Sequence, residues 1–112
     1  MIATGIDHWK PVCHTDRLTA ERGLAALIDG VQIALFRTHD GSLYAVGNID
    51  PFTGSAVLSR GIVGSRGNVP TVASPLHKQV FDLTTGRCLD DAETSVAAYE
   101  VRVNGDQIEV WV

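Results

Sequence analysis

Residues 74–86 read Ser74-Pro75-Leu76-His77-Lys78-Gln79-Val80-Phe81-Asp82-Leu83-Thr84-Thr85-Gly86. Pro75 stiffens the turn at the start of this stretch, because the proline ring fixes φ. The segments 80–83 and 87–89 flank the turn residues Thr84-Thr85-Gly86, which is typical of a short hairpin. We therefore expect a tight loop that leads directly into two short strands.

A second loop of the same kind lies upstream and reads Asn48-Ile49-Asp50-Pro51-Phe52-Thr53-Gly54. Asn48 and Asp50 favour turns because their short side chains hydrogen-bond to nearby backbone groups. Pro51 restricts the backbone as Pro75 does in the other loop. The sequence therefore predicts two compact loops in which a small polar residue and a proline lie close together.

Alternating apolar residues predict strands along most of the remaining chain. Val31, Ile33 and Leu35 fall on one side of a segment that returns, through a turn at 38–42, to a strand at 43–46. Such alternation indicates a half-buried strand and a hairpin.

The C-terminal segment repeats this pattern. Residues 99–103 and 108–112 alternate around Asn104-Gly105, which is the signal for a type I′ turn with two positive φ angles. We expect further strands at 8–13 and 26–28, and at most one helical turn within 15–21. Many short strands in 112 residues predict one all-β domain, residues 1–112, built as an antiparallel sandwich or barrel.

The glycine-rich stretch 58–68 lies in a segment, from about Asp50 to Pro70, that shows no strand pattern and that we interpret as a long loop. Its three glycines recur at every third position, and Arg60 and Arg66 flank them. Three interpretations stay open: a flexible loop with solvated arginines, a loop that docks on a partner protein, and a backbone cradle for an anion.

Composition limits the classes of function. The net charge of −4 argues against a nucleic-acid-binding protein, and no run of residues is long and apolar enough to cross a membrane. The N-terminus lacks the pattern of a signal peptide, so we expect a cytoplasmic protein. Thiols stay reduced there, and Cys13 and Cys88 are interpreted as small buried hydrophobic residues rather than a disulfide.

The two loops resemble the cluster-binding loops of Rieske proteins, in which Cys-x-His and Cys-Pro-x-His hold a [2Fe-2S] cluster through two thiolates and two imidazoles. The corresponding positions here hold Asn48, Asp50, Ser74 and His77, so we expect no cluster. A single metal ion on Asp50 and His77 would have only two ligands, fewer than a structural site normally uses. We instead expect Ser74 and His77 to hydrogen-bond across the space between the loops.

The whole chain, from about residue 8 to residue 112, resembles the small subunits of assimilatory NAD(P)H-dependent nitrite reductase. The segments that carry this resemblance are 32–37, 44–46, 48–52, 57–64, 74–83 and 86–89. The resemblance implies a Rieske-like antiparallel β-sandwich or barrel with two cluster-type loops at one end. It implies no catalytic residue, metal or cofactor in this chain, and a large subunit that carries FAD, an iron–sulfur cluster and sirohaem and reduces nitrite to ammonium.

Two other functions stay open at this stage. The first is a Rieske-type [2Fe-2S] electron-transfer ferredoxin, and the second is a free-standing binding module that uses loop 51–70. For a subunit that docks on a large partner, arginine and aromatic side chains at the loop end are the natural contacts. The candidate docking residues are Phe52, Arg60, Arg66, His77 and Lys78.

Overall fold

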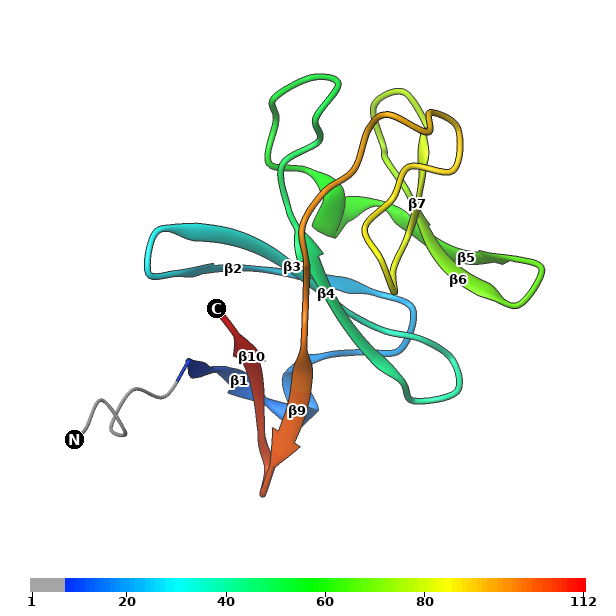
Figure 1. Cartoon of the computed structure of the whole chain (residues 1–112). Helices are drawn as coiled ribbons and strands as arrows, with labels where there is room; N and C mark the ends of the chain where they lie inside the picture. Colours follow the sequence, from blue (N-terminus) through cyan, green and yellow to red (C-terminus); the bar gives the residue numbers. More distant parts are fainter. Residues whose placement is uncertain (1–7) are drawn as a thin grey trace.

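The computed structural model describes residues 8–112, which fold into three antiparallel sheets (Figure 1). One sheet has the order β1-β10-β9, formed by Trp9–His14, Gln107–Trp111 and Val101–Asn104. The second has the order β2-β3-β4-β8, formed by Gly23–Ile28, Val31–Arg37, Leu43–Gly47 and Ala98–Tyr99. The third has the order β5-β6-β7, formed by Ile62–Arg66, Val69–Ala73 and Val80–Asp82.

The described residues contain no α-helix and only two short 3₁₀ turns, η2 (Thr15–Arg17) and η3 (Leu58–Arg60). The all-β prediction is therefore confirmed, and so is the short helical turn within 15–21. The sheets are open and do not close into a barrel, so the sandwich form of the prediction is the correct one. None of the elements in residues 8–112 is a helix able to span a membrane.

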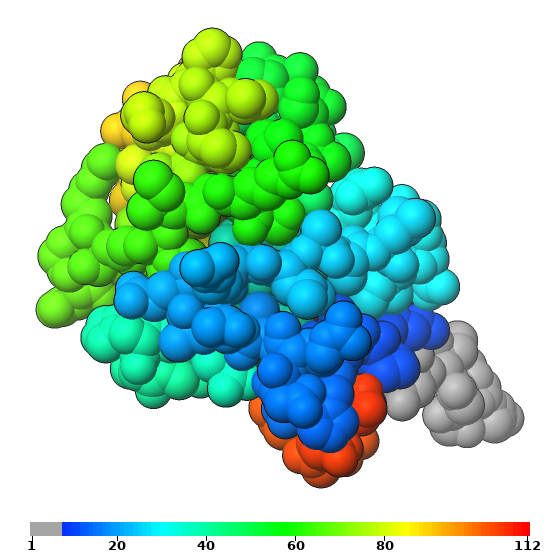
Figure 2. Space-filling model, turned by 180° about the vertical axis from the view of Figure 1, so that it is seen from behind, coloured from blue at the N-terminus to red at the C-terminus, as the bar shows by residue number. Residues whose placement is uncertain are grey.

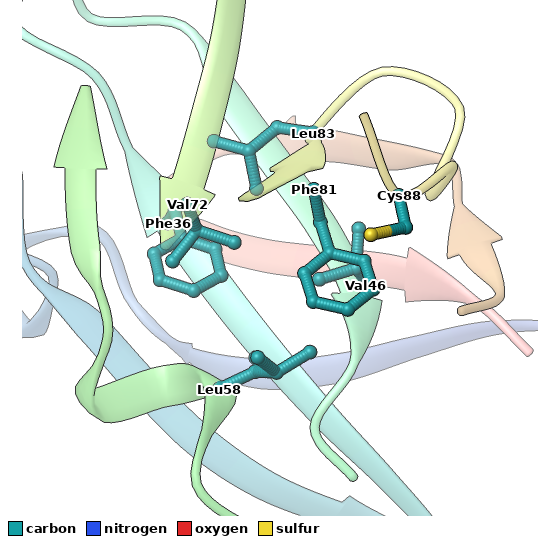
Figure 3. Close-up of a cluster of buried hydrophobic side chains, with 8 residues drawn as sticks. Phe36, Val46, Leu58, Val72, Phe81, Leu83 and Cys88 are labelled. Atoms are coloured by element: carbon teal, nitrogen blue, oxygen red, sulfur yellow. The ribbon is translucent and has the colours of Figure 1, made fainter. Parts of the chain in front are cut away.

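Strand β3 lies at the centre of the fold, because it is buried on both faces. Ile33 and Leu35 pack in one cluster with Ile108 of β10, so the sheet β1-β10-β9 covers that face. Ala34 and Phe36 pack in the other cluster (Figure 3). The remaining members of that second cluster are Val46, Leu58, Val72, Phe81, Leu83 and Cys88. The prediction of a half-buried strand was wrong, because two sheets pack on this strand from opposite sides.

The predicted hairpins form, with one change of register. Strands β3 and β4 pair from Ile33–Gly47 to Arg37–Leu43, and Phe81 of β7 bridges to Cys88 beyond the Thr84-Thr85-Gly86 turn. In the C-terminal hairpin Asn104 pairs with Gln107, so the central turn residues are Gly105 and Asp106. The prediction of two positive φ angles at Asn104-Gly105 was wrong, because only Gly105 has one (φ 65°).

Residues 50–70 do not form one long loop, so that expectation was also wrong. A bridge between Ile49 and Ala56 closes the first loop after a few residues. The turn η3 follows, and the chain then enters the hairpin of β5 and β6, which Figure 1 shows projecting away from the loop end. The glycine spacing obscured this hairpin, since glycine is depleted in strands.

Both cysteines are free thiols, as predicted. Cys88 is buried in the cluster of Figure 3, and half-buried Cys13 packs against the other core cluster. Burial raises the pKa of the Cys13 thiol, although nearby Arg17 and Arg37 oppose that shift. A raised pKa keeps Cys13 in its unreactive thiol form near neutral pH.

Gly86 closes the β7 hairpin in a conformation that other residues adopt at a cost. Its φ is +82°, and a Cβ would overlap the carbonyl oxygen of Val96, whose N–H donates to the Gly86 carbonyl at 2.8 Å. We expect Gly86→Ala to lower the free energy of unfolding, measured in urea, by about 3 kcal/mol through left-handed strain plus this overlap. Gly30→Ala is the matched control, because Gly30 has φ +81° and open space around it, so it should cost only about 1 kcal/mol. Equal losses in the two variants would contradict this steric explanation.

Candidate functional site

Asn48 joins the first loop to the central sheet and to η3. It follows β4 directly, and its backbone N–H donates to the carbonyl of Gln32 at 3.1 Å. Its own carbonyl accepts from the N–H of Leu58 at 3.0 Å, and its side-chain Oδ1 accepts from the N–H of Ser59 at 2.7 Å. A buried amide thus satisfies the backbone of the turn that carries Arg60.

Asp50 organises the first loop from inside. The residue is fully buried, and its Oδ1 accepts from the N–H of Phe52 at 2.8 Å, which is an Asx turn. Its backbone carbonyl accepts from the N–H of Gly54 at 2.7 Å, and its N–H donates to Ser55. The predicted turn-forming role of Asp50 is therefore confirmed.

Ser74 connects the two loops. Its hydroxyl donates to Oδ2 of Asp50 at 2.5 Å, a buried contact between residues 24 positions apart in the chain. The same oxygen accepts from the N–H of Leu76 at 3.3 Å. The backbone of Ser74 also closes its own loop, donating to Gln79 at 2.9 Å and accepting from Lys78 at 3.0 Å. A charge-assisted bond of this kind is among the stronger ones in proteins, so it holds the loops in one arrangement.

His77 lies apart from this network. Its side chain is exposed, and within residues 8–112 it forms no hydrogen bond. The expectation of hydrogen bonds across the gap is therefore right for Ser74 and wrong for His77. The neighbouring Lys78 has φ +63°, which turns the chain sharply after His77. This turn leaves the imidazole outside the loop pair.

These residues do not fit a Rieske cluster. The side chain of Asn48 is committed to Ser59, and both oxygens of Asp50 already accept hydrogen bonds. Ser74 offers a hydroxyl rather than a thiolate, and cluster iron requires thiolate or imidazole ligands. Across the described part of the chain, no three His, Cys, Asp or Glu side chains gather as a metal-binding group.

An exposed apolar patch covers the loop end. Ile49, Phe52 and Leu76 are 45%, 38% and 47% exposed, and we call these three residues the loop-end patch. The Phe52 ring lies 6.3 Å from the ring of buried Phe81, so the patch is continuous with the core. Sequence reasoning found Phe52 but missed Ile49 and Leu76. The signal that could have found Leu76 is its place directly after Pro75, which matches the place of Phe52 after Pro51, whereas no such signal marks Ile49.

The structure separates the candidate docking residues into two groups. Phe52, His77 and Lys78 belong to the two loops, whereas Arg60 lies on η3. Arg66 ends β5 and forms an exposed ion pair with Asp90, with 3.3 Å between Nη1 and Oδ1. A pair this exposed contributes at most about 1 kcal/mol and can open when a partner binds.

Charge is distributed unevenly between this region and the rest of the chain. Residues 47–80 contain three Lys and Arg residues and a single carboxylate, Asp50, which is buried. The rest of the chain holds the other 12 of 13 acidic residues and the other 6 of 9 basic residues. All the charged side chains that this segment exposes are therefore cationic, although the protein as a whole is acidic.

Comparison with known proteins gives consistent matches. The model of the Rieske-like [2Fe-2S] domain family matches residues 8–111. The chain is 41% identical to the small subunit of NADH nitrite reductase of Escherichia coli K12, over 94% of this chain and 98% of that protein. A Mycobacterium tuberculosis crystal structure assigned as an NADH-dependent nitrite reductase small subunit superposes with a TM-score of 0.90 at 51% identity, covering 94% and 95% of the two chains.

A third match is of a different kind. The chain is 40% identical, over 93% of its length, to a stretch that makes up 11% of the large subunit of NAD(P)H nitrite reductase of Klebsiella oxytoca. In that organism, a domain similar to this chain is thus part of the same polypeptide as the large subunit.

Removing the Ser74 hydroxyl tests the link between the loops. We expect Ser74→Ala to lower the free energy of unfolding by about 2 kcal/mol, because one oxygen of a buried carboxylate loses its partner. The control is Thr84→Ala, which deletes a hydroxyl that donates to Asp82 at 2.6 Å. That turn is exposed, so a water molecule can take over the hydrogen bond to the Asp82 carboxylate. Urea unfolding of both variants should show the larger loss for Ser74→Ala. A loss of the same size in the exposed turn would contradict a special role for the buried pair.

Proposed function

Because this chain belongs to the Rieske-like [2Fe-2S] domain family and, within it, to the small subunits of NADH-dependent nitrite reductase, we propose that it is a cluster-free, non-catalytic subunit that docks on the large subunit. The large subunit reduces nitrite to ammonium with electrons from NADH or NADPH, and FAD, an iron–sulfur cluster and sirohaem belong to it. The observation that carries the proposal is the buried Asp50–Ser74 hydrogen bond, which occupies two of the four ligand positions.

The residues at the four ligand positions fit a role in electron transfer less well than an accessory role. A Rieske ferredoxin passes electrons through a cluster held by four cysteine and histidine ligands. Of the four positions, only His77 keeps a ligand type, and its side chain points to solvent. We therefore assign the chain to assembly or stabilisation of the large subunit, or to the geometry of its electron path.

The Klebsiella match supports a stable complex in which each large subunit binds one small subunit. A polypeptide that includes both parts holds them at a ratio of one to one and at a very high effective concentration. We propose the same ratio for the separate subunits of this protein. We place the complex in the cytoplasm, since both cysteines are free and NAD(P)H is the electron donor.

We propose the loop end as one part of the docking surface. Apolar side chains that remain exposed next to one another mark interaction sites more often than scattered ones do. The three exposed side chains of the loop-end patch come from the two loops that the Asp50–Ser74 bond joins, and exposed His77 and Lys78 follow Leu76 in the chain. The Asp50–Ser74 bond keeps the patch in one shape before binding, which reduces the entropy lost on association.

The complex itself is the first test. Copurification from nitrite-grown cells should yield the two subunits at a ratio of one to one by native mass spectrometry. The separated small subunit should contain no iron and show no visible absorbance. Two irons in each small subunit would instead establish the ferredoxin function. A large subunit that reduces nitrite equally well without this chain, and never binds it, would disprove the accessory role.

A charge placed in the loop-end patch should weaken the complex. We expect Phe52→Asp to raise the dissociation constant by at least about tenfold, because a half-exposed aromatic anchor becomes a charge that must be desolvated. Val103→Asp is the control, since Val103 is 51% exposed on β9 at the opposite end of the molecule (Figure 1). Isothermal titration calorimetry on the purified subunits measures both, and equal affinities would exclude the loop end from the interface.

A further inference from the structure

Gly64 has no structural reason to be glycine. A Cβ at Gly61 would collide with the carbonyl oxygen of Ala73, and Gly67 has φ +65° in the hairpin turn, so the fold requires both. Gly64 has no positive φ, and a Cβ there would meet only Thr71 Oγ1 at an ordinary 3.7 Å. Glycine inside a strand weakens it and often marks a place where another backbone approaches closely. Nothing in the chain's own packing therefore requires glycine at this position of β5.

Strand β5, which contains Gly64, is the edge of its sheet. It pairs with β6, and Ser65 lies opposite Pro70. Pro70 has no N–H, and its carbonyl accepts from Leu83 on the other side of β6, so Ser65 and Pro70 exchange no hydrogen bonds. The N–H and C=O groups of Ser65, and by alternation those of Val63, therefore point to the free edge. Such an edge is a ready template for one more strand.

A groove runs along this edge. One hollow of about 590 Å³ lies between β5 and the segment that includes Glu21 and the turn after β3, and a second of about 520 Å³ continues it past η3. Glu21 and Val63 line both, so the two hollows adjoin each other. Figure 2 shows the face on which residues near 20–28 and 57–66 lie against each other. Val63 and Ser65, whose backbone groups are free, thus lie beside hollows that are open to solvent.

The charges around the groove favour an acidic occupant at the η3 end. Arg22 and Arg60 both line that end, both are exposed, and neither forms an ion pair within residues 8–112. Asp40, at the other end, is negatively charged at neutral pH, because the hydroxyl of Thr38 and the N–H of Ser42 donate to its carboxylate and lower its pKa to about 2. The positive charges therefore gather at the η3 end, where Arg22 and Arg60 outnumber Glu21, whereas Asp40 makes the other end unfavourable for a carboxylate.

We propose that the large subunit adds an extended segment to the free edge of β5, with a carboxylate of that segment between Arg22 and Arg60. Peptides bind sheet edges in this way elsewhere, with affinity from backbone hydrogen bonds and register from side chains. Exposed Ile62, at the start of β5, supplies an apolar contact. This inference rests on the proposed function and states how the partner binds.

The groove and the loop end belong to one continuous surface. The Asn48 side chain accepts from the N–H of Ser59, so the first loop holds the turn that presents Arg60 to the groove. A partner that covers the loop-end patch therefore has the start of β5 within reach. This connection explains why the amide of Asn48 is buried beneath a turn instead of facing solvent.

Proline at position 65 tests the strand addition. Ser65→Pro removes an outward N–H and no hydrogen bond of the hairpin, so the chain should fold while its dissociation constant for the purified large subunit rises about tenfold or more. Ser65→Ala keeps the N–H and is the matched control, with unchanged affinity. Calorimetric titration measures affinity, and circular dichroism confirms the fold of each variant.

Gly64→Val separates docking from folding. A β-branched side chain fits the strand and should raise the melting temperature. It projects from a face of the sheet and leaves the outward backbone groups of Val63 and Ser65 in place, so the affinity for the large subunit should stay at the wild-type value. Hydrogen exchange in the wild-type complex should also slow for the amides of segment 62–66. Wild-type affinity in Ser65→Pro, with a normal wild-type complex, would overturn the strand addition alone. Failure of the wild-type chain to bind at all would overturn the proposed function instead.

Discussion

Burial of β3 on both faces is the constraint on which the arrangement of the sheets depends. Ile33 and Leu35 pack against the sheet β1-β10-β9. Ala34 and Phe36, on the opposite face of the strand, pack against the sheet β5-β6-β7. Each large apolar side chain buried in this way contributes about 1.5–3 kcal/mol. The three sheets therefore stack around one strand, and both loops emerge from strands that this stacking has already fixed in place.

At the loop end, hydrogen bonds perform the task that metal coordination performs in a Rieske centre, which is to hold two loops together. The Asp50–Ser74 bond joins them, and Asn48 ties the first loop to η3. This solution removes the redox group but preserves the rigid end of the domain. In the function that we propose, the surface of the domain, rather than an iron centre, is what it contributes to the complex.

The two surfaces that we assign to the partner differ in physical character. The loop-end patch offers apolar area on a rigid support, whereas the edge of β5 offers unpaired backbone groups beside two arginines. Apolar contact supplies affinity without much direction, and strand pairing supplies direction and register. Together they would hold the chain in one orientation on the large subunit that we propose as its partner.

The sequence by itself determined the hairpins, the two compact loops and the loss of the cluster ligands, because alternation, turn residues and ligand types are local properties. It also contained a sign of the two-sided burial, since Ile33, Ala34, Leu35 and Phe36 form an uninterrupted apolar run. Only the tertiary structure decided which distant residues meet. Ser74 reaches Asp50, His77 turns outward and β5 is left as an edge because the stacking of three sheets sets those distances, and no local pattern records them.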